Sequence, residues 1–174
     1  MSKTTLKKQI KELTKEQLIE VMLELYDARK EAREYLEYYV NPDENKMFEK
    51  YNAIIHKEFF PQKGRAKGRT SVCKKAIKDF ISLHPSPKLI AELKFSTVEA
   101  IVKYAVNSRF WLKESQENTL LAFFKESLDY MFSNDLLDYF NRRIDDVLKR
   151  CNTSRCQFRD EIFRIKAEFD ESLK

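Results

Sequence analysis

The chain has 174 residues, of which 43% are apolar and 35% are charged, and its net charge is +5. This length supports one hydrophobic core, so we expect a single helical domain over residues 1–174. The two glycines and four prolines are too few for the turns of a β-sandwich, and no stretch of about 18 uncharged apolar residues could span a membrane. Residues 1–11 are polar, carry four lysines and are followed by no apolar run, so we expect no secretory signal.

The first 40 residues predict a short helix followed by a long one. An amphipathic helix is expected over residues 5–13. Thr14 and Gln17 have the Thr-x-x-Gln spacing of a capping box, which predicts a helix over residues 15–40. The apolar stripe of this helix is interrupted at Arg29.

Prolines set the next boundaries. Pro42 ends the long helix, and Pro61 ends a third helix that runs to about residue 60. The inward stripe of the third helix is Met47, Tyr51, Ile54, Ile55 and Phe59. Residues 62–69 hold both glycines and predict a flexible basic loop. A fourth helix follows, with the inward stripe Cys73, Ala76, Ile77, Phe80 and Ile81.

Four more helices complete the predicted fold. Ser86 and Pro87 have the residue types of an N-cap and a first helical position, and the fifth helix should run to about Val106 as the most buried of all. The others are expected after Ser115, over residues 137–151, and after Ser154. Short connections favour antiparallel neighbours. We therefore predict an all-α fold of about eight antiparallel-paired helices, forming a packed helical domain or a short HEAT-like α–α stack.

Several short motifs together resemble those of one family. They are Leu6–Leu13, Thr14–Asp27, Glu34–Glu37, Asn41-Pro42, Lys57–Pro61, Lys74–Phe80 and Pro85–Leu93. Over roughly residues 6–104 the chain resembles an uncharacterised bacterial family, an all-helical domain of unknown function. The resemblance implies a helical, bacterial and cytoplasmic protein, and it supplies no activity, cofactor or catalytic residue.

The cysteines and histidines predict neither a disulfide framework nor a metal site. Cys73, Cys151 and Cys156 are odd in number, which indicates reduced thiols in a cytoplasmic protein. Cys151 and Cys156 are close enough in sequence to approach each other across a turn, but the Cys-x-x-Cys spacing of zinc sites is missing. His56 and His84 are far apart in sequence. We expect no metal and no cofactor.

Catalytic motifs are also missing from the sequence. There is no Gly-x-Ser-x-Gly, His-Glu-x-x-His or P-loop pattern, and histidine is scarce as a general base. Cys73 lies on an apolar stripe, which favours a packed thiol over a nucleophile. We expect no catalytic residue and no enzyme activity, with an enzyme of unrecognised type as the last alternative.

Positive charge is concentrated in the middle of the chain. Residues 61–104 have a net charge of +7, whereas the segments on either side have −1 each. Seven cations occur without an intervening acid: Lys63, Arg65, Lys67, Arg69, Lys74, Lys75 and Lys78. This pattern predicts a binding site for nucleic acid or another polyanion. The alternative is that these cations keep a loop soluble or pair with acidic surface such as Glu34, Glu37, Asp43 and Glu44.

Phe110 and Trp111 lie on a connector between helices and form a candidate protein interface. The general tendency of large apolar residues favours their folding back over the core. Because catalytic groups are missing and aromatic residues are plentiful, the first hypothesis is a non-catalytic helical module that binds another protein or itself. Polyanion binding through residues 63–78 is the alternative.

Overall fold

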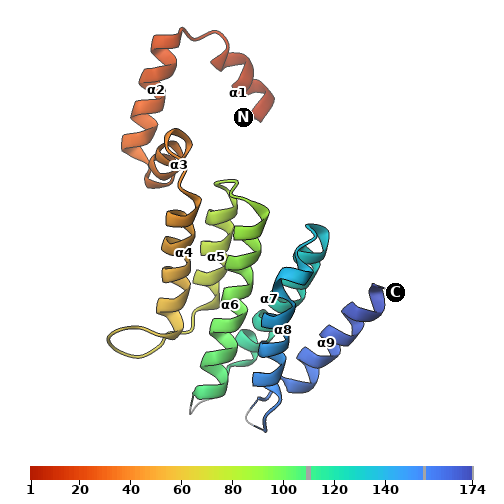
Figure 1. Ribbon diagram of the computed structural model, residues 1–174. Coiled ribbons are helices and arrows are strands. Elements are labelled where there is room, and N and C mark those ends of the chain that lie inside the picture. The colour runs from red at the N-terminus through yellow and green to blue at the C-terminus, as the bar shows by residue number, and fades with distance from the viewer. Residues whose placement is uncertain (109–110, 155, 174) are drawn as a thin grey trace. The chain divides into compact units, whose positions relative to one another are not determined.

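The computed structural model describes residues 1–108, 111–154 and 156–173. Every regular element in these ranges is an α-helix, which confirms the all-α prediction (Figure 1). Nine helices are present there: α1 Lys3–Ile10, α2 Lys15–Ala28, α3 Lys30–Val40, α4 Glu44–Phe59, α5 Thr70–Ile81, α6 Pro87–Asn107, α7 Glu114–Ser133, α8 Leu137–Cys151 and α9 Arg159–Ser172. The chain divides into two compact units, an N-terminal unit Met1–Asp43 and a C-terminal unit Glu44–Lys174.

The capping box predicted at the start of α2 is present. The backbone N–H of Gln17 donates to Oγ1 of Thr14 at 3.2 Å, and the backbone N–H of Thr14 donates to Oε1 of Gln17 at 2.9 Å. These bonds satisfy two backbone donors that the first turn of a helix leaves without partners.

The single helix predicted over residues 15–40 is wrong, because Arg29 separates α2 from α3. Arg29 has extended backbone angles, with φ −135° and ψ 118°. A continuous helix would stack Asp27 on Glu31 and Arg29 on Arg33, and both like-charged pairs are unfavourable. At the break, Arg33 instead donates from Nε to the carbonyl oxygen of Tyr26 at 3.3 Å. This bond satisfies a carbonyl that the end of α2 leaves open.

The C-terminal unit is built around α6. This helix contacts α4, α5, α7 and α8, and α9 contacts α7 and α8. Because α6 contacts both α4 and α8, these three helices form one layer, and α5, α7 and α9 pack against it (Figure 1).

Large aromatic side chains fill the core of this unit, and Phe80 among them belongs to a predicted apolar stripe. The largest fully buried side chains include Phe80 of α5, Phe95 of α6, Phe124 of α7 and Phe140 of α8. Helix α6 starts at Pro87 after Ser86, as predicted, and more of its residues are buried than in any other helix described. The prediction that Ile54 and Ile81 face the core is wrong. Both lie at the edges of their stripes, and their side chains are more than one-third exposed.

Arg143 joins α8 to α6. Its guanidinium donates to both oxygens of Glu99, at 2.9 and 2.7 Å, and forms an ion pair with Glu92. The guanidinium also stacks over the rings of Phe95 and Phe140, at 5.5 and 5.1 Å from their centroids. This planar group is held by charge on its edge and by aromatic rings on its faces.

In the part of the chain that the structure describes, no helix combines the length and apolar content needed to cross a bilayer.

Candidate functional site

The N-terminal unit exposes its apolar side chains. Within residues 1–43, Tyr38 is the one buried large apolar residue. The apolar stripe of α2 predicts a helix that faces a core. In the structure this stripe is exposed to solvent instead, and Met22 and Leu25 are each 48% exposed. The exposed large apolar residues after Met1 are Leu6, Ile10, Leu13, Ile19, Val21, Met22, Leu23, Leu25, Tyr35, Tyr39 and Val40. We call the part of this set on α1 and α2 the α1–α2 surface.

The two helices of this surface carry opposite charge. Helix α1 holds Lys3, Lys7 and Lys8 and no acid, giving +3. Helix α2 holds Lys15 against four acidic residues, giving −3. Helices of opposite net charge attract each other, whereas two copies of the same helix repel each other.

Trp111 is exposed, contrary to the expectation that it folds back. Its side chain is 67% exposed, whereas Leu112 beside it is buried. Leu112 thus supplies the apolar contact that the connector makes with the core. Phe110, the other residue of the candidate interface, lies outside the described residues.

The seven cations between residues 63 and 78 fall into separate groups. Lys63, Arg65 and Lys67 are exposed on the loop between α4 and α5. Lys75 lies 3.9 Å from Asp79 on the exposed side of α5. Arg69 belongs to a structural ion pair, and Lys74 and Lys78 line a groove. The sequence alone does not separate these roles.

Glu58 fixes the end of the basic loop to α4. Its side chain is only 6% exposed, and its oxygens accept bonds from Arg69 Nε at 3.0 Å and Nη2 at 2.7 Å. The Glu58 carbonyl accepts the backbone N–H groups of Lys67 and Gly68, at 3.0 and 2.9 Å. The bond from Arg69 holds the pKa of Glu58 below its ordinary value of 4.5. The Arg69 guanidinium is therefore already occupied by Glu58, which makes Arg69 a weaker candidate for polyanion binding than the loop lysines.

Gln116 of α7 holds the same loop from the other side. Its Nε2 donates to the carbonyl oxygen of Gly68 at 2.7 Å. Gly68 has φ +59°, and a Cβ there would approach Gln116 Nε2 to 2.6 Å. Glycine is favoured here because the backbone is left-handed and the Gln116 side chain lies against it.

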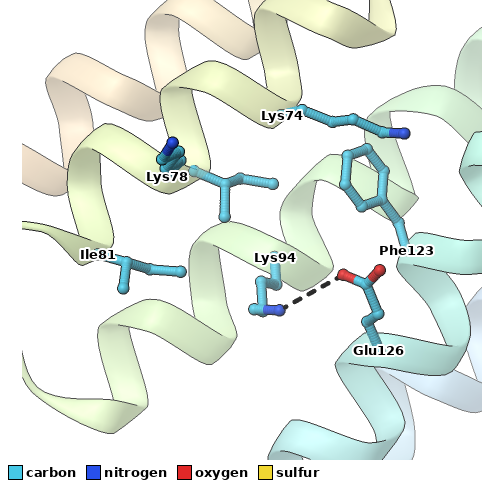
Figure 2. A pocket seen from close by; sticks show the side chains of 7 residues that line it. Lys74, Lys78, Ile81, Lys94, Phe123 and Glu126 are labelled. Carbon is cyan, nitrogen blue, oxygen red and sulfur yellow. Dashed lines mark ion pairs between the residues drawn. The ribbon is translucent and has the colours of Figure 1, made fainter.

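A groove of about 360 Å³ lies between α5 and α7 with α6 as its floor. Figure 2 shows Lys74 and Lys78 from α5, Lys94 from α6, and Phe123 and Glu126 from α7 around it. The Lys94 side chain is 15% exposed, and its Nζ lies 3.7 Å from Glu126. Three lysines and one carboxylate line the groove together with Ile77, Ile81 and Phe123, so the net charge of its lining is positive. Lys94 was not among the predicted cations because it lies within the apolar α6 sequence, away from residues 63–78.

A second groove, of about 280 Å³, lies on the other layer between α4, α6 and α8. It brings His56 near Glu99 and Asp146, with Lys103 and Arg150 also on its walls. Glu99 is already bonded to Arg143, and no cysteine lines the groove. Among the described residues, no three His, Cys, Asp or Glu side chains are grouped as metal ligands.

The Cys73 thiol is a packed group. It is fully buried and donates to the carbonyl oxygen of Arg69 at 3.7 Å. Burial raises the pKa of Cys73 to about 12, so the reactive thiolate is scarce near neutral pH.

Comparison with the curated proteins gives no significant match, and comparison with the solved structures gives none. One family model matches residues 1–170, described as a family of unknown function, DUF6155. The match extends well beyond residues 6–104, to which the motif resemblance is limited, and it includes the connector with Trp111. The chain therefore belongs to DUF6155, a family of unknown function.

Proposed function

We propose that this protein is a non-catalytic helical interaction module that associates through the α1–α2 surface. The observation that carries the proposal is the exposure of the apolar stripe of α2 where the sequence predicts a core-facing helix. Exposed apolar patches on soluble proteins commonly mark interaction sites, because burying them on a partner removes them from water.

The partner that fits this surface is a second copy of the chain. Helix α1 carries +3 and helix α2 carries −3, so α1 of one copy is complementary to α2 of the other. A two-fold axis would form this contact twice, as in the commonest symmetric dimers. The charges would favour the pairing and its register, and the apolar side chains would supply the burial.

The test is the molar mass of the full chain by light scattering during size-exclusion chromatography, over a range of concentrations. The proposal predicts a concentration-dependent rise from 20.8 kDa to twice that mass. A chain that keeps the monomer mass up to millimolar concentration would overturn it.

Charge reversal makes this test specific to the pairing of α1 with α2. Lys7→Glu with Lys8→Glu gives one variant, and Glu20→Lys with Glu24→Lys gives another. Each variant alone should dimerise more weakly, since both helices then carry charge of one sign. An equimolar mixture should recover the dimer, because the reversed α1 of one variant faces the reversed α2 of the other. Lys125→Glu with Arg142→Glu, on exposed positions of the C-terminal unit, is the control.

Polyanion binding is the second candidate function, favoured by the basic loop. Lys63, Arg65 and Lys67 are exposed, and none is ion-paired with another described residue. In a mobility-shift assay with mixed RNA and DNA at low salt, changing these three residues to Gln should abolish binding. Arg69 is left intact because it holds Glu58. Equal binding by this variant and by a Lys125, Arg142 and Lys149 to Gln control would contradict the candidate.

We place this module in the cytoplasm of a bacterium. The three cysteines without disulfide spacing and the family resemblance support this setting. Cell fractionation with an antibody against the chain tests it, and recovery in a membrane or extracellular fraction would contradict it.

A further inference from the structure

The groove between α5 and α7 carries positive charge that its own lining leaves uncompensated. Lys74 and Lys78 lie one turn apart on α5, and both are exposed. In the part of the chain that the structure describes, neither forms an ion pair. Like charges at this spacing repel each other on a helix, so the fold gains nothing from placing them together. Lys94 pairs with Glu126, the one acidic residue among the described residues that line the groove.

Apolar side chains run beside these lysines. Ile77 and Ile81 each follow one of the two α5 lysines by three residues, so α5 presents a row of isoleucines beside its row of lysines. Figure 2 shows Ile81 on the α5 side of the groove and Phe123 on the α7 side, with Lys94 of α6 between them. Ile77 and Phe123 are largely covered, whereas Ile81 is 36% exposed. Ile81 is therefore open to an apolar side chain from outside the molecule.

The size and the rim of the groove favour a segment of another protein over a small molecule. Its volume of about 360 Å³ is near the lower end for small-molecule sites, which bury most of their ligand. Here Lys74, Lys78 and Glu126 are exposed on the rim, so a bound molecule would keep one side in water. An amphipathic helix has this form, because its apolar face is buried in a groove while its other face stays solvated. Nucleic acid fits less well, since its phosphates would face Glu126 and would leave Ile81 uncovered.

We propose that this groove is a docking site for an acidic amphipathic helix of a different protein. In a helix antiparallel to α5, carboxylates at positions i and i+4 repeat the one-turn spacing of Lys74 and Lys78, about 6 Å along the axis. Apolar residues at i+3 and i+7 of that helix form the adjacent row, which meets Ile81. One row then pairs opposite charges and the other buries apolar surface. The groove belongs to the C-terminal unit, so this site is independent of the α1–α2 surface.

The primary test is the fluorescence anisotropy of a labelled helical peptide titrated with the full chain. The peptide repeats Glu at i and i+4 and Leu at i+3 and i+7 on an Ala and Gln background, over about 18 residues so that a helix can form. Lys74→Glu with Lys78→Glu should weaken binding by about tenfold or more, and added salt should weaken binding to the wild type. Arg142→Glu with Lys149→Glu makes the same charge change at exposed positions of α8 and should bind nearly as the wild type does. No binding at millimolar protein, or equal binding by the two charge variants, would overturn the proposal.

Glu126→Gln separates docking from a structural role of the Lys94–Glu126 ion pair. The change frees Lys94 for the peptide and removes a carboxylate that repels it, so binding of the acidic peptide should tighten several-fold. A pair with a structural role alone would leave the affinity unchanged. That result, or weaker binding, would contradict the proposed chemistry of the groove.

Two further measurements distinguish the other occupants. A peptide with Ser in place of Leu should bind more weakly than the original peptide. Equal binding by the Ser peptide, together with displacement by mixed RNA and DNA, would make the groove a polyanion site instead. Light scattering of the Lys74→Glu, Lys78→Glu variant should give the same concentration-dependent mass as the wild type, and loss of the dimer would show that a second copy occupies the groove. A wild type that stays monomeric and still binds the peptide would contradict the α1–α2 proposal alone.

Discussion

The N-terminal and C-terminal units both contain amphipathic helices, but only the C-terminal unit covers their apolar faces within itself. In residues 44–174, α6 lies among four neighbouring helices and buries aromatic rings such as Phe95. In residues 1–43, α2 has a comparable stripe that stays half exposed. The difference shows that helical periodicity identifies an apolar face without identifying what covers it. An exposed stripe leaves apolar surface in contact with water, whereas a covered stripe contributes to the stability of the fold.

The largest expected effect is on the C-terminal core. Phe95 is fully buried, and its ring packs against Phe140 with centroids 5.8 Å apart. Phe95→Ala should lower the free energy of unfolding by about 3–5 kcal/mol through lost burial and the cavity left behind. Urea denaturation followed by circular dichroism measures this. A loss below about 1 kcal/mol would contradict the assignment of this unit as the packed one.

The next largest effect on stability is expected at the ion pair between Glu58 and Arg69. Glu58→Gln removes the charge with which Arg69 pairs and should lower the free energy of unfolding by about 1 kcal/mol. This value is at the low end for a buried polar group because the Arg69 side chain is half exposed to solvent. The pKa of Glu58 is lowered by folding, so its contribution is present above its ordinary value of 4.5 and is lost as pH falls through the folded value. The stability difference between wild type and Glu58→Gln should shrink as the pH is lowered below 4.5. A difference that grows with acidification would show that Glu58 does not stabilise the fold as a carboxylate.

A smaller effect is expected at the start of α2. Thr14→Ala removes the side-chain oxygen that accepts the Gln17 N–H, and should destabilise α2 locally by about 0.5–1 kcal/mol. Amide hydrogen exchange should speed up in the first turns of α2 and remain unchanged in α6. Faster exchange throughout the C-terminal unit would mean that the two units unfold as one.

The smallest effect on folding is expected from the exposed stripe itself. Met22→Gln with Leu25→Gln should change the free energy of unfolding of the C-terminal unit, measured by urea denaturation, by less than about 0.5 kcal/mol, since neither side chain is buried. The same variant should lose the concentration-dependent dimer. Phe132→Gln, an exposed apolar position of the C-terminal unit, is the control for association and should keep the dimer. A loss of several kcal/mol from the α2 variant would place these residues in a folded core.

Local signals predicted much of the fold. The Thr14–Gln17 box and the Ser86-Pro87 start depend on short-range bonding and backbone preference, and both are present. The stripe Cys73, Ala76, Ile77 and Phe80 is buried as its spacing predicts. The break at Arg29 was visible only as an interrupted stripe and two like-charged pairs, which do not by themselves decide whether a helix ends.

The candidate sites depended on long-range contacts, and the sequence predicted them less well. Arg69 reads as one of seven similar cations until α4 brings Glu58 against it. Lys94 joins Lys74 and Lys78 because α5 and α7 flank α6, which no local pattern encodes. The exposure of Trp111 depends on Leu112 making the core contact in its place.

The most direct test of the central claim is amide hydrogen exchange of the full chain, compared between residues 1–43 and 44–174 over a range of protein concentrations. If the chain dimerises through the α1–α2 surface, protection in α1 and α2 should rise with protein concentration while protection in α6 stays constant. Strong protection of α1 and α2 at the lowest concentration, or weak protection at every concentration, would contradict it.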